Sequence, residues 1–254
     1  MYATFKDKIS SIFKKSTNHK YLYLHIPKTA GTAIIKQIKK SKFKDNFTCK
    51  SHEYTTHKLN KSEKSNYIFT SIRNPISWYA SLYNFKMNPH PPDATKDYFW
   101  MPNNSLEDFI EDIVLVKNGK EGLKKWHKPW ESKLHIKEMV EAYLNTRANE
   151  QIGFLTLNFL YYCFDTWNEI LKQKDINQFL IENYQSLISV NKVIRMENLQ
   201  QEFKEMLEGT KIEVDLSKKI NATSSNPYLD QLSQKSLDSI KNRDRAIFEI
   251  FGYL

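Results

Sequence analysis

The stretch YLYLHIPKTAGTAIIKQIKK, residues 21–40, decides how the fold begins. Residues 21–26 alternate aromatic and aliphatic side chains, which predicts a buried strand. An alanine and three isoleucines recur at helical spacing in residues 31–40, which predicts a helix. Small residues fill the few positions between them. The stretch therefore predicts a strand, a tight loop and a helix in succession.

Three further segments are predicted to be strands. They are FTCKS at 47–51, YIFTSI at 67–72 and VNKVIR at 190–195. The segment PISWYASLYNFKM follows the second of these and begins with proline, which is favoured at a helix start because its missing N–H costs nothing there. Strands that alternate with helices at this spacing favour an α/β fold with a central parallel sheet flanked by helices.

Length and composition predict one domain over residues 1–254, since a chain of 254 residues with 40% hydrophobic content can bury a sizeable core. Residues 1–20 form a basic segment, predicted to be either a solvated helix or a short amphipathic helix that touches a membrane surface. Residues 86–190 are predicted to be variable and largely helical. They include a proline-rich stretch at 88–104 and a helix that starts with the capping box of Ser105 and Asp108.

The charge of the chain narrows the classes of partner. A net charge of +9 favours phosphorylated cofactors, acidic glycans, nucleic acid or an anionic membrane. The two cysteines, Cys49 and Cys163, lack the spacing of a disulfide framework or a zinc site. No signal-peptide pattern is present, and no stretch is apolar for the ~20 residues of a membrane span, so we expect a soluble, cytoplasmic protein.

The loop PKTAGT, residues 27–32, has the features of a phosphate-binding site. A strand that ends in a small-residue loop before a helix presents unpaired backbone N–H groups and the positive end of the helix dipole. Gly31 permits close approach of the backbone, Thr29 and Thr32 offer hydroxyl groups, and Lys28 adds a positive charge. The lysine precedes the glycine, so the loop is not a Walker A motif.

A second set of residues follows the strand at 67–72. Arg73 comes directly after this strand, and Ser81 lies about two turns into the next helix. In a parallel sheet this helix start opens on the same edge as the first. Two anion-binding helix starts on one edge suit a ligand with two separated phosphate groups.

Together the two motifs carry a family resemblance. PKTAGT after a strand, followed by RNPISWYASLY, resembles the carbohydrate sulfotransferases that use 3'-phosphoadenosine 5'-phosphosulfate (PAPS), namely the Golgi-type enzymes and their bacterial relatives. VIRMENLQQEF and the closing INATSSNPY with FGYL are similar to further segments of that family. The resemblance covers about residues 20–85 and 190–254. The chain departs from the family at Ala33, where Ser or Thr is common, and at Trp78, where a second arginine is common.

The resemblance implies a P-loop-like sulfotransferase fold and transfer of a sulfuryl group from PAPS to a hydroxyl acceptor, a carbohydrate or glycolipid. It implies that the 3'-phosphate of PAPS binds Arg73 and Ser81. It implies that the 5'-phosphosulfate binds the loop residues Lys28, Thr29, Ala30, Gly31, Thr32 and Ala33. Lys28 would also stabilise charge on the leaving phosphate. No metal is expected.

The acceptor hydroxyl must lose its proton, so a base is expected near the loop. The segment SHEYTTH, residues 51–57, follows the strand at 47–51, where the family often places a base. His52 is the best positional match and Glu53 is the alternative. A neutral imidazole titrates near the working pH range, which favours His52.

Three other charged or polar residues are predicted to be structural. His25 lies within the first predicted strand, where a histidine satisfied in the core or at the strand edge is expected. Arg195 and Glu197 follow the strand at 190–195 and are expected to pair with each other or to brace the sheet.

The expected partner is a hydroxyl-bearing acceptor, most simply a saccharide, that meets residues 86–190. No nucleic-acid partner is expected, peripheral membrane contact stays open, and the sequence does not predict an oligomeric state. Two other functions stay open. One is a small-metabolite kinase with an atypical phosphate loop, which would need a magnesium site. The other is a non-enzymatic module that binds polyanions through the +9 charge.

Overall fold

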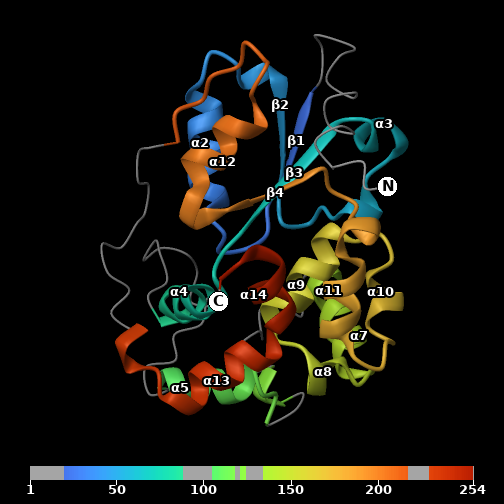
Figure 1. The fold of residues 1–254 in the computed structure, drawn as a ribbon, viewed down its shortest axis with the longest axis vertical. Helices are drawn as coiled ribbons and strands as arrows, with labels where there is room; N and C mark the ends of the chain where they lie inside the picture. The colour runs from blue at the N-terminus through green and yellow to red at the C-terminus, as the bar shows by residue number, and fades with distance from the viewer. Residues whose placement is uncertain (1–19, 88–104, 118–120, 124–133, 217–228, 254) are drawn as a thin grey trace.

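The computed structural model describes residues 20–87, 105–117, 121–123, 134–216 and 229–253. Figure 1 shows a central sheet with helices on both faces. Four strands, in the order β2-β1-β3-β4, are all parallel, which confirms the predicted α/β class. Their bounds are β1 Tyr21–Leu24, β2 Phe47–Lys50, β3 Tyr67–Ile72 and β4 Lys192–Arg195.

Successive side chains of β1 pack on opposite faces of the sheet. Tyr21 and Tyr23 pack with α2 (Gly31–Lys40) and α12 (Leu199–Met206), whereas Leu22 and Leu24 belong to the larger core on the opposite face. That larger core contains residues of α4 (Pro75–Met87) and α9 (Phe154–Cys163). Because successive strand residues point to opposite faces, all four residues of β1 are buried.

The remaining helices of the described residues lie between these elements and after α12. They are η1 Lys44–Asn46, η2 Thr56–Lys58, α3 Lys61–Lys64, α5 Leu106–Ile113, α7 Leu134–Leu144, α8 Ala148–Gln151, α10 Trp167–Ile170, α11 Ile176–Leu187, η4 Met196–Asn198, η5 Leu229–Gln231, α13 Gln234–Arg243 and α14 Arg245–Phe251. The capping box predicted for α5 is confirmed: Ser105 Oγ accepts from Asp108 N at 3.1 Å, and Asp108 Oδ2 accepts from Ser105 N at 2.9 Å. The proline-rich stretch 88–104 and residues 1–19 of the basic segment lie outside the described residues.

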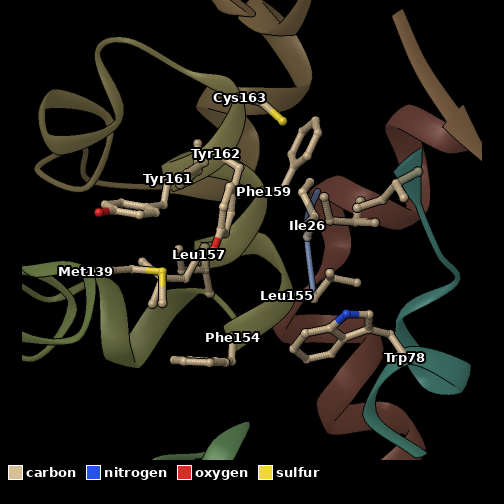
Figure 2. Close-up of a cluster of buried hydrophobic side chains, with 14 of the residues drawn as sticks. Ile26, Trp78, Met139, Phe154, Leu155, Leu157, Phe159, Tyr161, Tyr162 and Cys163 are labelled. Carbon is tan, nitrogen blue, oxygen red and sulfur yellow. The ribbon is translucent and has the colours of Figure 1, made fainter. Parts of the chain in front are cut away.

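Helix α9 forms the centre of the larger core. All ten of its residues are buried, as expected for a helix that is apolar on every side. Figure 2 shows its side chains next to Ile26, which follows β1, and Trp78 of α4. The core thus extends directly under the loop between β1 and α2.

A buried carboxylate at the junction of α13 and α14 joins these helices to α4 and α9. Asp244 lies between α13 and α14, and its Oδ1 accepts hydrogen bonds from the backbone N and the Oγ1 of Thr156, at 2.8 and 2.6 Å. Its Oδ2 accepts from the hydroxyl of Tyr79 on α4, at 2.8 Å. Burial raises the pKa of Asp244 to about 6, against these hydrogen bonds, which lower it. A Cβ at Gly153 would overlap this carboxylate, which explains the glycine before α9.

Replacing Asp244 with alanine is expected to lower the free energy of unfolding by about 3 kcal/mol, because buried donors of Tyr79 and Thr156 lose their acceptor. Chemical denaturation measures this loss. Asp238→Ala is the matched control, since Asp238 is exposed on α13 and, among the described residues, accepts a local bond from Gln234. That control should change the free energy by less than about 0.5 kcal/mol. Equal effects of the two substitutions would contradict the role of Asp244.

Candidate anion-binding site

The site lies where the order of the strands reverses. β1 pairs with β2 on one side and with β3 on the other, so the loops after all three strands open on one edge. Helix α2 packs on one face of the sheet and α4 on the other. In parallel α/β sheets, ligands bind in the crevice at such a reversal point.

Buried hydroxyl groups hold the loop that follows β1. Thr29 is fully buried, and its Oγ1 donates to the carbonyl of Ile26 at 2.8 Å. The hydroxyl of Ser71 on β3 donates to the carbonyl of Thr29 at 2.6 Å and lies 2.7 Å from the hydroxyl of Tyr23. The Thr29 hydroxyl, which the sequence predicts as a ligand contact, therefore forms its hydrogen bond within the loop. A ligand would meet this residue through its backbone N–H.

Trp78 fixes the same loop from α4. Its indole Nε1 donates to the carbonyl of Pro27 at 2.8 Å, and the side chain is buried. This tryptophan stands at the position where a second arginine is common in the resembled family. A buried indole N–H needs a hydrogen-bond acceptor, and this general requirement is the signal that could have predicted a bond from Trp78 to the loop.

The backbone of the loop adopts an uncommon conformation. Lys28 and Ala30 have φ values of 66° and 69°, in the left-handed region that non-glycine residues seldom occupy. Each such residue costs roughly 1–3 kcal/mol and persists where surrounding contacts impose it. Gly31 has a further reason to be glycine, since a Cβ there would overlap the ring of His25.

Helix α2 begins without a side-chain cap and without an acidic residue in its first turn. Within the described part of the chain, the backbone N–H groups of residues 29–32 have no protein acceptor. Ala33 N instead bonds to Ala30 O at 2.9 Å, inside the helix start. Unpaired N–H groups and the positive end of the helix dipole make this helix start a candidate anion-binding site.

Two cations from neighbouring strand ends lie beside this helix start. Burial, and after it repulsion from the Arg73 guanidinium, lowers the pKa of Lys28 to about 8. Burial also lowers the pKa of Arg73, partly offset by Glu197 and Tyr253. Among the described residues neither Lys28 nor Arg73 forms an ion pair with a carboxylate. An anion bound between them would relieve both the repulsion and the desolvation.

Ser81 lies on the face of α4 that meets the loop. Trp78, three residues before it, contacts Pro27, and the Phe85 ring, four residues after it, lies 4.3 Å from the Nζ of Lys28. Residues at this spacing share one helix face, so half-buried Ser81 lies between these two contacts. The structure therefore brings Ser81 to the same region as Lys28. No sequence pattern predicts the contact of Phe85 with Lys28.

Arg195 and Glu197 do not pair with each other. Arg195 Nε instead donates to Glu202 Oε1 at 2.6 Å, which ties β4 to α12. Glu197 Oε1 accepts from the backbone N of Asn74 at 2.9 Å, and its Oε2 accepts from the Tyr253 hydroxyl at 2.9 Å. Glu197 thus links the chain end to the start of α4, next to Arg73.

His52 lies on the other side of the loop, after β2. Its Nδ1 lies 2.9 Å from the carbonyl oxygen of His25. A carbonyl only accepts, so Nδ1 carries the proton and, in the neutral ring, the lone pair is on Nε2. The carbonyl of His52 accepts from the Tyr162 hydroxyl of α9 at 2.7 Å. Glu53, the alternative base, has an exposed side chain.

His25 supports this arrangement as a neutral residue. Burial, followed by His52 and Lys28, lowers its pKa to about 3, so its ring is uncharged near neutral pH. The ring centroids of His25 and His52 are 4.0 Å apart. The predicted structural role of His25 agrees with this packing.

The described residues contain no group of three or more His, Cys, Asp or Glu side chains placed to hold a metal ion. Among the helices that the structure describes, none combines the length and apolar content needed to cross a membrane. A comparison with protein-family models, with curated proteins and with solved structures finds no match for this chain.

Proposed function

We propose that the protein is a PAPS-dependent sulfotransferase with a P-loop-like sulfotransferase fold, which acts on a hydroxyl group of a carbohydrate or glycolipid. One observation carries the proposal. Lys28 and Arg73 converge from the ends of neighbouring strands beside an uncapped helix start, and neither is paired with a carboxylate in the described chain. A donor with two phosphate-bearing positions supplies the anions that these two cations require.

The two ends of the donor take different residues in this proposal. The 5'-phosphosulfate meets the backbone N–H groups of residues 29–32 and the ammonium of Lys28, with the exposed hydroxyl of Thr32 as a further donor. The 3'-phosphate meets Arg73 and Ser81. The acceptor approaches from the side of His52, and residues 86–190 supply its remaining contacts.

The chemical step is a sulfuryl transfer. The acceptor oxygen forms a new bond to sulfur as the bond from sulfur to the bridging phosphate oxygen breaks, and adenosine 3',5'-bisphosphate leaves. Nε2 of His52 takes the hydroxyl proton. Lys28 stabilises the negative charge that grows on the departing phosphate, which is the largest contribution expected from the protein.

The test is to incubate the purified protein with PAPS and a panel of saccharide and glycolipid acceptors and to measure adenosine 3',5'-bisphosphate. We expect acceptor-dependent release, together with tighter binding of this product than of ATP with Mg²⁺. Absence of release with a preference for ATP and Mg²⁺ would instead favour a metabolite kinase. Salt-sensitive binding of polyanions without nucleotide binding would favour the non-enzymatic module.

A further inference from the structure

Two large hydrophobic side chains are exposed in the described part of the chain, Phe85 at 40% and Tyr54 at 39%. Packing in the core does not account for either of them. Each ring lies under a lysine ammonium: Nζ of Lys28 is 4.3 Å from the centroid of Phe85, and Nζ of Lys50 is 4.2 Å from that of Tyr54. Both distances are within the range of a cation–π contact.

The two lysines differ in their other contacts. Lys50 is also held by an ion pair with Glu63, so its position does not depend on Tyr54 alone. Lys28 has no ion pair within the described ranges, and the ring of Phe85 is the contact seen for its ammonium. A lysine side chain carries considerable rotamer freedom, which must be lost when the ammonium meets a fixed phosphate.

We propose that Phe85 is a positioning residue, whose ring holds the Lys28 ammonium at the mouth of the loop for the phosphate of the donor. The inference rests on the proposed function, since it concerns how Lys28 meets that phosphate. An ammonium has three N–H donors, so contact of one side with the ring leaves donors for an anion on the other. Trp78 fixes the backbone of the loop from the same face of α4, and Phe85 fixes the side chain.

The test compares Phe85→Leu, which removes the ring, with Phe85→Tyr, which keeps it. We expect Phe85→Leu to weaken the binding of adenosine 3',5'-bisphosphate about two- to fivefold, because the free-energy range of an exposed cation–π contact corresponds to this change. Phe85→Tyr should bind as the unmodified protein does. Tyr54→Leu is the matched control, because Tyr54 has nearly the same exposure and a similar contact with a different lysine, Lys50; it should leave this affinity unchanged.

A second set of variants ties the effect to Lys28. In a Lys28→Met background, Phe85→Leu should cause no further loss of affinity. Equal or tighter binding by Phe85→Leu, a loss in Phe85→Tyr, or the same loss in the Lys28→Met background would overturn the inference. In each of these outcomes the proposed function survives, because the unmodified protein still binds the nucleotide.

Failure of the proposed function gives a different result. If the unmodified protein binds no adenosine 3',5'-bisphosphate, the sulfotransferase proposal falls, and the position of Lys28 is then read by NMR. A ring-current shift of the Lys28 ε-methylene protons that Phe85→Tyr keeps and Phe85→Leu loses supports the placement of this ammonium by the ring. Absence of that shift in the unmodified protein overturns it.

Discussion

Replacement of Lys28 by alanine is expected to lower sulfuryl-transfer turnover by about 10²–10³-fold, the usual effect of removing one group that stabilises transition-state charge. Binding of adenosine 3',5'-bisphosphate should also weaken, because Lys28 is half-buried beside the helix start and, in the proposed mechanism, would meet a phosphate in both the ground state and the transition state. Product release and calorimetric titration measure the two effects. Lys36→Ala, at an exposed position on α2, is the control and should change neither.

The charge of Lys28 also predicts how binding depends on pH. Its pKa is lowered to about 8 by burial and then by Arg73, so the ammonium loses its proton where an ordinary lysine keeps it. A phosphate binds the protonated form, and affinity should therefore fall as pH rises through about 8, by up to about tenfold per pH unit. His25, with a pKa of about 3, stays neutral throughout this range.

Lys28→Arg separates this effect from other titrations. An arginine keeps its charge across the range, so the fall in affinity near pH 8 should disappear in this variant even if its affinity is lower. Titrations with adenosine 3',5'-bisphosphate from about pH 7 to pH 9.5 test the difference. Matching pH curves for the two proteins would remove Lys28 from the anion site, and unchanged turnover in Lys28→Ala would remove it from the mechanism.

The sequence predicts the elements of this fold because local patterns determine them. YLYL and YIFTSI are each buried almost throughout in the sheet, and the helical spacing after Gly31 becomes α2 with the predicted bounds. A proline at the start of α4 and the capping box of Ser105 mark two helix starts correctly. In each case the signal lies within about one turn of the residue that it describes.

Contacts between distant residues could not be predicted in this way. The bond from Trp78 to the carbonyl of Pro27 spans 51 positions, and the bond from Thr156 to Asp244 spans 88. No periodicity connects such pairs. The order of the strands also depends on contacts between distant residues, because β3 pairs with β1 and not with β2, the strand before it in the chain.

The sequence motifs predict some residues of the candidate site and give no signal for others. The motifs predict Lys28 and Arg73 as site residues, and the topology brings these two charges close together because they follow neighbouring strands. The PKTAGT motif predicts that the Thr29 hydroxyl contacts the ligand, but a buried hydroxyl takes the nearest acceptor, which is the carbonyl of Ile26. Phe85 gave no signal, since its role depends on contact with Lys28 and not on its neighbours in the chain.

His52→Ala is expected to lower turnover by about 10²–10⁴-fold, the range for loss of a positioned general base. Binding of adenosine 3',5'-bisphosphate should stay unchanged, because in the proposed mechanism His52 acts on the acceptor and not on the donor. Single-turnover product release and calorimetric titration separate the two quantities. A fall in affinity equal to the fall in turnover would instead make His52 a support for the loop.

Glu53→Gln decides between the two candidate bases. If His52 is the base, this substitution leaves turnover within a few-fold of the unmodified protein, since Glu53 is exposed and its carboxylate takes no proton. The reverse pattern, with a large loss in Glu53→Gln and a small one in His52→Ala, would assign the base to Glu53. The hydrogen bond from Nδ1 to the His25 carbonyl favours His52, because it fixes the tautomer in which Nε2 accepts the proton.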